Sequence, residues 1–346
     1  MGTTFRTGLV VGKFSPLHQG HERLIRAAQG QCERLLLLCW SLPELPGCDA
    51  GRRERWLRLR FPELQAEVVT PARIQAWREQ GKRLPGLPHN DAPEFEPRQF
   101  VAEFCQAVFG TTVDAVFTSE GYGEGFAAHL AGVFGHPVRH VCVDPQRLAV
   151  PVSGTRLRAD PHGLRGFLAP EVHADFVERI VLLGGESTGK SSLAIALAAA
   201  LDAPCVAEFG REHWVAKDGQ LEFDDLLHIG RNQVAREDRA ALTAGRYLVC
   251  DTSALTTLFY SQAMFGRAEA ELATLAERPY AHTFLCADDF PFVQDGTRQD
   301  ETFRRRQQAW YRAELQRRGW PFQVLSGPLE ARVQQVLDAL RGGSPG

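Results

Sequence analysis

The sequence predicts an α/β protein with two domains, each built on a mainly parallel sheet. Apolar runs of strand length alternate with amphipathic stretches of helix length, and this alternation starts a second time in the middle of the chain. The length of 346 residues also exceeds the roughly 100–200 that are usual for one domain. We therefore expect one domain over residues 1–172 and a second over residues 173–346.

Each predicted domain has five strand-like apolar runs. In the first domain they are residues 8–11, 34–40, 66–69, 115–118 and 138–143. In the second they are residues 179–183, 204–207, 247–250, 282–286 and 322–325, with an alanine-rich helix over 192–201 after the first of them. The proline-rich segment 81–97 predicts a loop, and a loop of this length is better suited to covering a site than to building a core.

Composition excludes several classes of function. With 39 basic and 42 acidic residues the formal net charge is −3, which argues against nucleic acid or an anionic membrane as the main partner. No apolar run reaches the ~18–20 residues of a membrane span, and no secretory leader pattern opens the chain, so we expect a cytoplasmic protein. The eight dispersed cysteines form no C-x-x-C pair and are expected to be reduced thiols. A homo-oligomer is compatible with the sequence.

A glycine- and histidine-containing motif directly follows the first predicted strand. Residues 12–21 read G-K-F-S-P-L-H-Q-G-H, and a helix pattern follows through residue 29. Gly12 lets backbone amides, with Lys13 and Phe14 beside them, approach phosphate oxygens, and the start of the helix turns its positive end toward the same anion. His18 and His21 can donate hydrogen bonds to oxygens that gain charge when an α-phosphate is attacked. A lone histidine is more often structural, but this pattern favours phosphate chemistry.

A second segment is expected to complete this site. Residues 152–158 read V-S-G-T-R-L-R at the exit of a strand, and they supply the hydroxyls of Ser153 and Thr155 and the guanidinium of Arg158. Taken alone, the segment is more typical of a serine N-cap followed by a surface arginine. Paired with the upstream motif, it favours a phosphate-binding role.

The second domain opens with the pattern G-x-x-x-x-G-K-S between a predicted strand and a predicted helix, which is the context that a P-loop requires. Lys190 is expected to contact the β- and γ-phosphates of ATP, and the Ser191 hydroxyl to ligate Mg²⁺. The expected nucleotide contacts are Gly184, Gly185, Glu186, Ser187, Thr188, Gly189, Lys190, Ser191 and Ser192.

Charged residues after later strands indicate where an acceptor and its catalyst lie. Asp251 ends an apolar strand and is suited to holding Mg²⁺ through water or to activating an acceptor hydroxyl; the alternative is a cap on the following helix. Glu208 and Arg211 follow the preceding strand, near where an acceptor is expected.

An arginine-containing segment late in the chain predicts a lid. Residues 295–298 read D-G-T-R, which is typical of a lid that delivers Arg298 to the transferring phosphate. Residues 304–306 are three further arginines, which we interpret as a solvated helix face. No N-K-x-D guanine-reading pattern is present, so a small-molecule kinase is favoured over a GTPase.

Residues 8–160 resemble the nucleotidyltransferase superfamily, whose members carry H-x-G-H and a later I-S-S/G-T-x-x-R motif; Val152 stands here in place of the usual Ile. The resemblance implies a Rossmann-like sheet and transfer of AMP or CMP from a nucleoside triphosphate to a phosphate-bearing acceptor, with Mg²⁺. It also implies that His18 and His21 stabilise the triphosphate, that Arg158 neutralises its phosphate tail, and that Lys13 assists at the acceptor or leaving group.

The two halves together resemble the bifunctional NadR-type family, over nearly the whole chain. Besides the nucleotide motifs, the matching residues are 119–120, 143–145, 208–212, 251–252, 256–257 and 295–298. The resemblance implies a kinase that phosphorylates nicotinamide riboside and an adenylyltransferase that joins nicotinamide mononucleotide to AMP, giving NAD and pyrophosphate. Each half would use ATP and Mg²⁺.

The chain departs from this family in three respects. Its first predicted strand starts by Gly8, so we expect neither the N-terminal helix-turn-helix domain of some members nor repression by that route. Ser253 stands where an acidic residue is common, which implies altered kinase specificity. Segment 81–97 lacks a tryptophan to stack on nicotinamide; Trp77 lies nearby, and a place in the core is the alternative for it. Two alternatives stay open: the same chemistries on another phosphorylated acceptor, or a nucleotide-sensing regulatory module.

Overall fold

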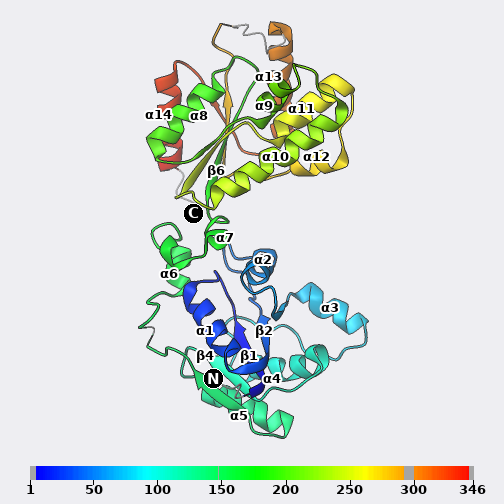
Figure 1. The fold of residues 1–346 in the computed structure, drawn as a ribbon, viewed down its shortest axis with the longest axis vertical. Helices are drawn as coiled ribbons and strands as arrows, with labels where there is room; N and C mark the ends of the chain where they lie inside the picture. Colours follow the sequence, from blue (N-terminus) through cyan, green and yellow to red (C-terminus); the bar gives the residue numbers. More distant parts are fainter. Residues whose placement is uncertain (1–4, 147, 292–299, 343–346) are drawn as a thin grey trace. The chain divides into compact units, whose positions relative to one another are not determined.

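A computed structural model describes residues 5–146, 148–291 and 300–342 of the chain. The chain divides into two compact units, Met1–Phe176 and Val177–Gly346. Each unit contains a five-stranded sheet with helices on both faces, and all of the strand pairings described are parallel (Figure 1). The expected fold class, two α/β domains on parallel sheets, is confirmed.

The first unit has the strand order β3-β2-β1-β4-β5. Its elements are β1 Phe5–Gly12, α1 Gln19–Gln29, β2 Cys32–Cys39, α2 Ala50–Arg60, β3 Gln65–Val68, α3 Pro71–Glu79, α4 Phe95–Phe104, a π-helical turn Cys105–Phe109, β4 Ala115–Thr118, α5 Gly123–Phe134, β5 Arg139–Cys142, α6 Gly154–Ala159, a 3₁₀ turn Arg165–Phe167 and α7 Pro170–His173. Strands β2 and β3 lie on one side of β1 in the sheet, and β4 and β5 lie on the other side. The direction in which strands are added therefore reverses at β1.

Alternation along the strands divides the first core into two layers. Leu9 of β1 packs in one cluster with residues of α3, α4 and α5, and its neighbour Val10 packs in another with residues of α1 and α2. Both side chains are fully buried. Successive side chains of a strand point to opposite faces, so a continuous apolar run here indicates a strand covered by helices on both sides.

The second unit has the strand order β10-β9-β6-β8-β7. Its elements are β6 Glu178–Leu183, α8 Lys190–Leu201, β7 Cys205–Val206, α9 Phe209–Ala216, α10 Phe223–Ala241, β8 Tyr247–Asp251, α11 Ala254–Phe265, α12 Ala270–Leu275, β9 His282–Cys286, α13 Glu301–Arg317, β10 Gln323–Leu325 and α14 Leu329–Gly342. Helices α8 and α14 cover one face of this sheet, and α10, α11 and α12 lie on the other side (Figure 1).

Each of the ten predicted strands forms, with ends that differ by three residues or fewer from those expected. The largest difference is at β1, which begins at Phe5 because its first amide donates to Gln31 O and the residue pairs with Cys32. The predicted alanine-rich helix is α8, which starts two residues early, at Lys190.

The first unit ends at Phe176, four residues beyond the expected domain end at residue 172. The extra residues pack on α2: the Trp56 indole donates to Asp175 Oδ2 at 2.6 Å, and the rings of Trp56 and Phe176 stack 6.1 Å apart. Since Trp56 is fully buried, these contacts belong to the first core.

Two further expectations concern cysteines and membranes. All eight cysteines are free thiols, six of them buried, and burial raises the pKa of Cys39 to about 11. Over the described ranges, the structure contains no helix with the length and apolar character needed to cross a bilayer.

Close packing around Gly8 in the central strand yields a stability prediction. A Cβ at this position would lie 2.3 Å from Cys32 Sγ and 2.9 Å from Phe117 Cε2. Gly8→Ala should therefore lower the free energy of unfolding by ~1–3 kcal/mol through overpacking. The matched control is Gly132→Ala in α5, where an added Cβ meets nothing within 4 Å and better helix propensity should stabilise by ~0.5–1 kcal/mol. Chemical denaturation measures both, and equal effects would contradict the packing described here.

Candidate active sites

The first unit has a cavity where the carboxyl ends of β1 and β4 meet the starts of α1 and α6. Ligands of open α/β sheets bind at such a reversal of strand order. The cavity volume of about 860 Å³ lies in the range of ~300–1,000 Å³ found for ligand sites. Its walls include Gly12, Lys13, Phe14, His18, His21, Trp40, Glu120, Tyr122, Ser153, Thr155 and Arg158, so all sequence-predicted residues of this half line one cavity.

The two histidines are fixed by the start of α1. His18 is the N-cap residue, and its Nδ1 accepts a hydrogen bond from the Gly20 amide at 3.1 Å. Because Nδ1 accepts, the neutral imidazole carries its proton on Nε2, where it can be donated to a ligand. The rings of His18 and His21 stack with centroids 3.7 Å apart, and Phe14 packs edge-on against His21 at 5.1 Å. The motif thus sets two imidazoles side by side at the cavity.

The second segment joins the first through backbone contacts. Arg158 donates to Ser15 O, and a Cβ on Gly154 would lie 2.9 Å from the same oxygen, so the close approach requires glycine. Ser153 is the N-cap of α6 and accepts from the Arg156 amide at 3.4 Å. The capping alternative for Ser153 is therefore realised, and the residue lines the cavity as well.

Aromatic residues of this cavity were missed by the sequence analysis. Trp40 directly follows β2, lines the cavity and packs edge-on against Phe100 at 5.2 Å. Trp77, the nearby candidate, instead packs on Phe104 in the core at 5.3 Å. The position of Trp40 was the signal that could have found it. Trp40 follows Cys39, which pairs with Gly12, so the ends of β1 and β2 lie at the same edge of the sheet.

Part of the proline-rich segment 81–97 lines the same cavity. Its lining residues are His89, Asn90, Asp91, Ala92, Glu94 and Pro97. Asn90 anchors the segment: its backbone amide donates to Leu42 O at 2.7 Å, and its side chain donates to Pro43 O at 2.8 Å. The predicted loop therefore forms a wall of the site, but the prediction is wrong for residues 95–97, which open α4.

The P-loop of the second unit connects β6 to α8. Lys190 Nζ donates to the carbonyl oxygens of Gly184 at 2.9 Å and Gly185 at 2.8 Å. Gly184 has a φ of 145° and lies against β9, where an added Cβ would be 2.9 Å from Cys286 O. The ammonium group thus rests on the loop's own carbonyl groups, in the place where the motif is expected to meet phosphates.

Buried polar side chains hold this loop from behind. The amides of Gly185 and Glu186 donate to Gln308 Oε1 at 2.9 Å and Gln307 Oε1 at 3.0 Å. Arg332, only 1% exposed, donates to Thr188 O at 2.7 Å. The sequence analysis missed all three supporting residues, because polar side chains on amphipathic helices are normally assigned to the solvent face.

The interpretation of residues 304–306 as a solvated face is wrong for Arg304. That residue is 4% exposed, and its guanidinium donates to Phe290 O at 2.9 Å and Asp288 O at 3.2 Å. It shares the inner face of α13 with Gln307 and Gln308, three and four residues later. Arg305 and Arg306 are exposed as expected. Residues 295–298, with the predicted catalytic Arg298, lie outside the described residues.

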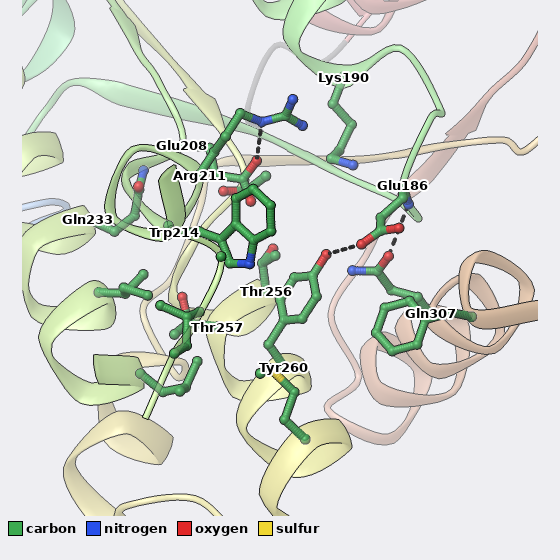
Figure 2. A pocket seen from close by; sticks show the side chains of 18 of the residues that line it. Glu186, Lys190, Glu208, Arg211, Trp214, Gln233, Thr256, Thr257, Tyr260 and Gln307 are labelled. Atoms are coloured by element: carbon green, nitrogen blue, oxygen red, sulfur yellow. Dashed lines mark hydrogen bonds and ion pairs between the residues drawn. The ribbon is translucent and has the colours of Figure 1, made fainter. Parts of the chain in front are cut away.

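A second cavity lies beside the P-loop. Figure 2 shows Trp214 and Tyr260 turned into it, with Glu208 and Arg211 on one side and Glu186 and Gln307 on the other. Its lining also includes Lys190, Gln233, Thr252, Thr256, Thr257 and Phe303. The cavity thus combines aromatic rings with carboxylates and hydroxyls, and it contains the predicted residues Glu186, Ser187, Lys190, Glu208 and Arg211.

Two carboxylates near Lys190 have different surroundings. Burial raises the pKa of Glu208, and Asp251 raises it further, although Lys190 opposes the shift. Glu208 forms an ion pair with Arg211 at 3.7 Å. Asp251 is 4% exposed at the end of β8, and its Oδ1 is buried without a hydrogen-bond partner among the described residues. Ser253, which accepts from the Leu255 amide at 3.2 Å, caps α11, so the capping alternative for Asp251 is wrong.

Comparisons with known proteins relate both sites to one family. A family model described as an AAA domain matches residues 179–332. Two curated proteins, from Escherichia coli strain K12 and Salmonella typhimurium strain LT2, are both named "Trifunctional NAD biosynthesis/regulator protein NadR". Each is 28% identical over 311 residues, covering 84% of this chain and 71% of the relative. The chain is homologous to NadR. The resemblance to the NadR-type family is thereby confirmed.

Solved NadR structures share the fold. A crystal structure described as NadR protein in complex with NR has a TM-score of 0.69 and 20% identity, and the match covers 99% of this chain and 96% of that one. A NadR structure with NAD and AMP-PNP has a TM-score of 0.68 and 20% identity, with 98% and 96% covered. The NadR fold therefore extends over nearly the whole chain.

Support of the P-loop by Arg332 yields a prediction. Arg332→Met keeps the apolar length but leaves the carbonyls of Thr188, Gly327 and Ala287 without this donor and the Asp289 carboxylate without its ion pair. Local opening of β6 and the P-loop, measured by hydrogen exchange, should cost ~2–4 kcal/mol less than in the unchanged protein. Arg341→Ala is the control, because Arg341 is 72% exposed and pairs with Asp338 at 3.3 Å, a contact worth ~0–1 kcal/mol. Equal exchange in both variants would contradict a supporting role.

Proposed function

We propose that the chain is a bifunctional NAD-salvage enzyme. Its second unit, expected over residues 173–346, phosphorylates nicotinamide riboside with ATP. Its first unit, expected over residues 1–172, transfers AMP from ATP to nicotinamide mononucleotide and releases NAD and pyrophosphate. Homology to NadR over 84% of the chain supports both activities together.

The composition of the cavity beside the P-loop is the observation that carries the choice of acceptor. Trp214, Tyr260 and Phe303 offer aromatic faces, and Glu186 and Glu208 add two carboxylates. The ring of a nicotinamide riboside is a positively charged pyridinium, and aromatic faces attract cations, most strongly where water is excluded. A neutral nucleobase would gain less from the same carboxylates. The chemistry of the cavity therefore favours a cationic aromatic acceptor.

Kinase chemistry requires a base near the attacking hydroxyl. Glu208 lines the cavity, whereas Asp251 lies buried at the end of β8 and does not line it. We therefore assign to Glu208 the removal of the hydroxyl proton as the oxygen bonds to the γ-phosphorus and the bond to ADP breaks. Lys190 leaves the carbonyls of Gly184 and Gly185 and binds the transferring phosphate. Arg211 steadies Glu208 through their ion pair.

Mg²⁺ fits the polar groups next to the P-loop. The structure as described contains no cluster of three or more His, Cys, Asp or Glu residues that could hold a metal by themselves. Mg²⁺ bound with a nucleotide needs only one or two protein ligands, because phosphates and water supply the others. Ser191 lies in the first turn of α8, and the unpartnered Oδ1 of Asp251 is a hard oxygen donor. We propose these two residues as ligands; the ion would neutralise charge on the phosphates.

In the first unit, the geometry fits attack of a phosphate on the α-phosphorus of ATP. His18 presents its Nε2 proton, and His21 stacks on the same ring, so both can stabilise the oxygens that gain charge. Arg158 and Lys13 add positive charge from the same cavity. The acceptor phosphate oxygen bonds to the α-phosphorus as the bond to pyrophosphate breaks. Trp40 and Tyr122 supply aromatic surface for a nicotinamide ring.

Separate substitutions test the assignment of two activities to two units. His18→Ala should lower adenylyl transfer at least ~10²-fold and leave phosphorylation of nicotinamide riboside within about twofold. Lys190→Ala should do the reverse. The assay resolves ADP, pyrophosphate, mononucleotide and NAD after incubation with Mg-ATP and either substrate. Loss of both activities in a folded single variant would overturn the assignment, and turnover of neither substrate by the unchanged protein would favour another acceptor.

The role of Glu208 is tested by the pH dependence of the kinase. Because burial raises the pKa of this carboxyl, the unprotonated base is lost as pH falls through that raised value, and kcat/KM should fall with it. Glu208→Gln should lower kcat by ~10²–10⁴-fold and abolish this acidic limb. Glu212→Gln is the control, since Glu212 pairs with Arg236 on the exposed side of α9. An acidic limb that persists in Glu208→Gln would assign the base to another group.

A further inference from the structure

A glycine lies against the aromatic wall of the cavity beside the P-loop. Gly219 and Trp214 both line this cavity, and the indole is turned into it (Figure 2). A Cβ at position 219 would lie 2.8 Å from Trp214 Cζ2 and 3.3 Å from both Cε2 and Cη2. Carbon atoms in van der Waals contact are about 3.5–4.0 Å apart. The indole therefore occupies its observed place only because residue 219 has no side chain.

The turn that contains Gly219 is held in place by hydrogen bonds. The Gly219 amide donates to Trp214 O at 2.9 Å, and the φ of 81° at this residue is left-handed. On either side of the glycine in the sequence, Lys217 Nζ and the Glu222 amide donate to Asp225 of α10, at 2.7 Å and 2.8 Å. Moving the turn would break these contacts, so we expect it to keep its position.

Within the ranges that the structure describes, the Trp214 indole has no hydrogen bond and no stacked aromatic neighbour. The residue is half-buried, and the open space toward which the ring is turned is the cavity itself (Figure 2). A side chain at position 219 would therefore displace the indole rather than the turn, and the displaced indole would enter the cavity.

A small displacement matters because the cavity is narrow. Its volume is about 160 Å³, below the ~300–1,000 Å³ usual for ligand sites. The indole would have to move by roughly 0.7 Å to restore an ordinary carbon–carbon contact with the new Cβ. Because tryptophan is the aromatic side chain that attracts cations most strongly, this movement would act directly on a cationic acceptor ring.

We propose that Gly219 is a positioning residue for the acceptor: because it lacks a side chain, the Trp214 indole lies against the turn and the cavity stays wide enough for a cationic ring. The inference rests on the proposed function, because it requires an acceptor that binds beside this indole. It predicts a change in acceptor binding without a change in ATP binding, since Trp214 lies outside the P-loop.

Steady-state kinetics of the full chain measure this effect. In Gly219→Ala, the KM for nicotinamide riboside should rise ~3–30-fold, the loss expected when a cation is moved off an aromatic face. The kcat of the kinase, and the affinity for AMP-PNP measured by titration calorimetry with Mg²⁺, should stay within about twofold, because only acceptor binding is weakened. Adenylyl transfer by the first unit should be unchanged.

Gly319→Ala is the matched control for backbone strain. Gly319 follows α13 with a φ of 65°, and an added Cβ there meets nothing within 4 Å. Both variants place an alanine in a left-handed conformation, but only Gly219→Ala creates a collision. The control should leave the KM for nicotinamide riboside within about 1.5-fold.

Removal of the outer part of the indole should rescue the variant. A phenyl ring has no counterpart of the outer indole atoms Cζ2 and Cη2, so Gly219→Ala should have little further effect in a Trp214→Phe background. The KM of the double variant should lie within about twofold of that of Trp214→Phe alone. A general loss of structure would instead raise KM in both backgrounds.

The outcomes separate this inference from the function on which it rests. If the unchanged protein does not phosphorylate nicotinamide riboside, the proposed acceptor is wrong and the role of Gly219 fails with it. If it does, an unchanged KM in Gly219→Ala, an equal rise in Gly319→Ala, or an equal rise in both Trp214 backgrounds overturns the role of Gly219 alone. Loss of AMP-PNP binding in Gly219→Ala would also overturn it, because the turn rather than the indole would then have moved.

Discussion

Both sites depend on one constraint, the parallel arrangement of strands. A parallel sheet brings the carboxyl ends of all its strands to one edge, and the central strand of each unit ends there in glycine: β1 at Gly12, and β6 just before Gly184. A glycine at this point lets the chain turn into a helix start while its amides stay accessible to an anion. The last residues of neighbouring strands lie at the same edge, and Asp251 at the end of β8 is one of them.

The two units use this shared edge for different electrostatics. The first places two imidazoles with Lys13 and Arg158 at the strand ends, beside carboxylates and aromatic rings of the cavity walls, which suits a reaction between two phosphate groups. The second places two carboxylates and three aromatic rings around Lys190 and Arg211, which suits a hydroxyl acceptor on a cationic ring. Partly buried carboxylates such as Glu186 and Glu208 lose hydration, which is costly unless a charge or a hydrogen bond compensates them. Arg211 and Lys190 compensate Glu208, and the Tyr260 hydroxyl compensates Glu186. The side chains added to each sheet edge therefore account for the two chemistries.

Strands and nucleotide motifs were predictable from the sequence because both are local. Apolar runs identified the strands, and the spacing of His18 and His21 predicted that both face one site, which is the cavity that they line. Contacts made across long sequence separations were not predictable. Trp40 follows a strand end and Trp77 lies in α3, and the three-dimensional packing shows that Trp40 lines the cavity while Trp77 packs on the core. The interpretation of Arg304 was wrong for the same reason. Three consecutive arginines resemble a solvated face, but Arg304 lies on the inner side of α13.

The buried polar groups behind the P-loop hold its backbone in one position. Backbone groups of Gly185, Glu186 and Thr188 are held by Gln308, Gln307 and Arg332, and each of these supporting residues is at most 5% exposed. Moving the backbone would break hydrogen bonds in a place where water cannot replace them. The protein itself therefore holds the loop in place. Lys190 donates to the carbonyls of Gly184 and Gly185, so in the proposed kinase its ammonium group exchanges these two contacts for phosphate oxygens while the loop backbone keeps its position.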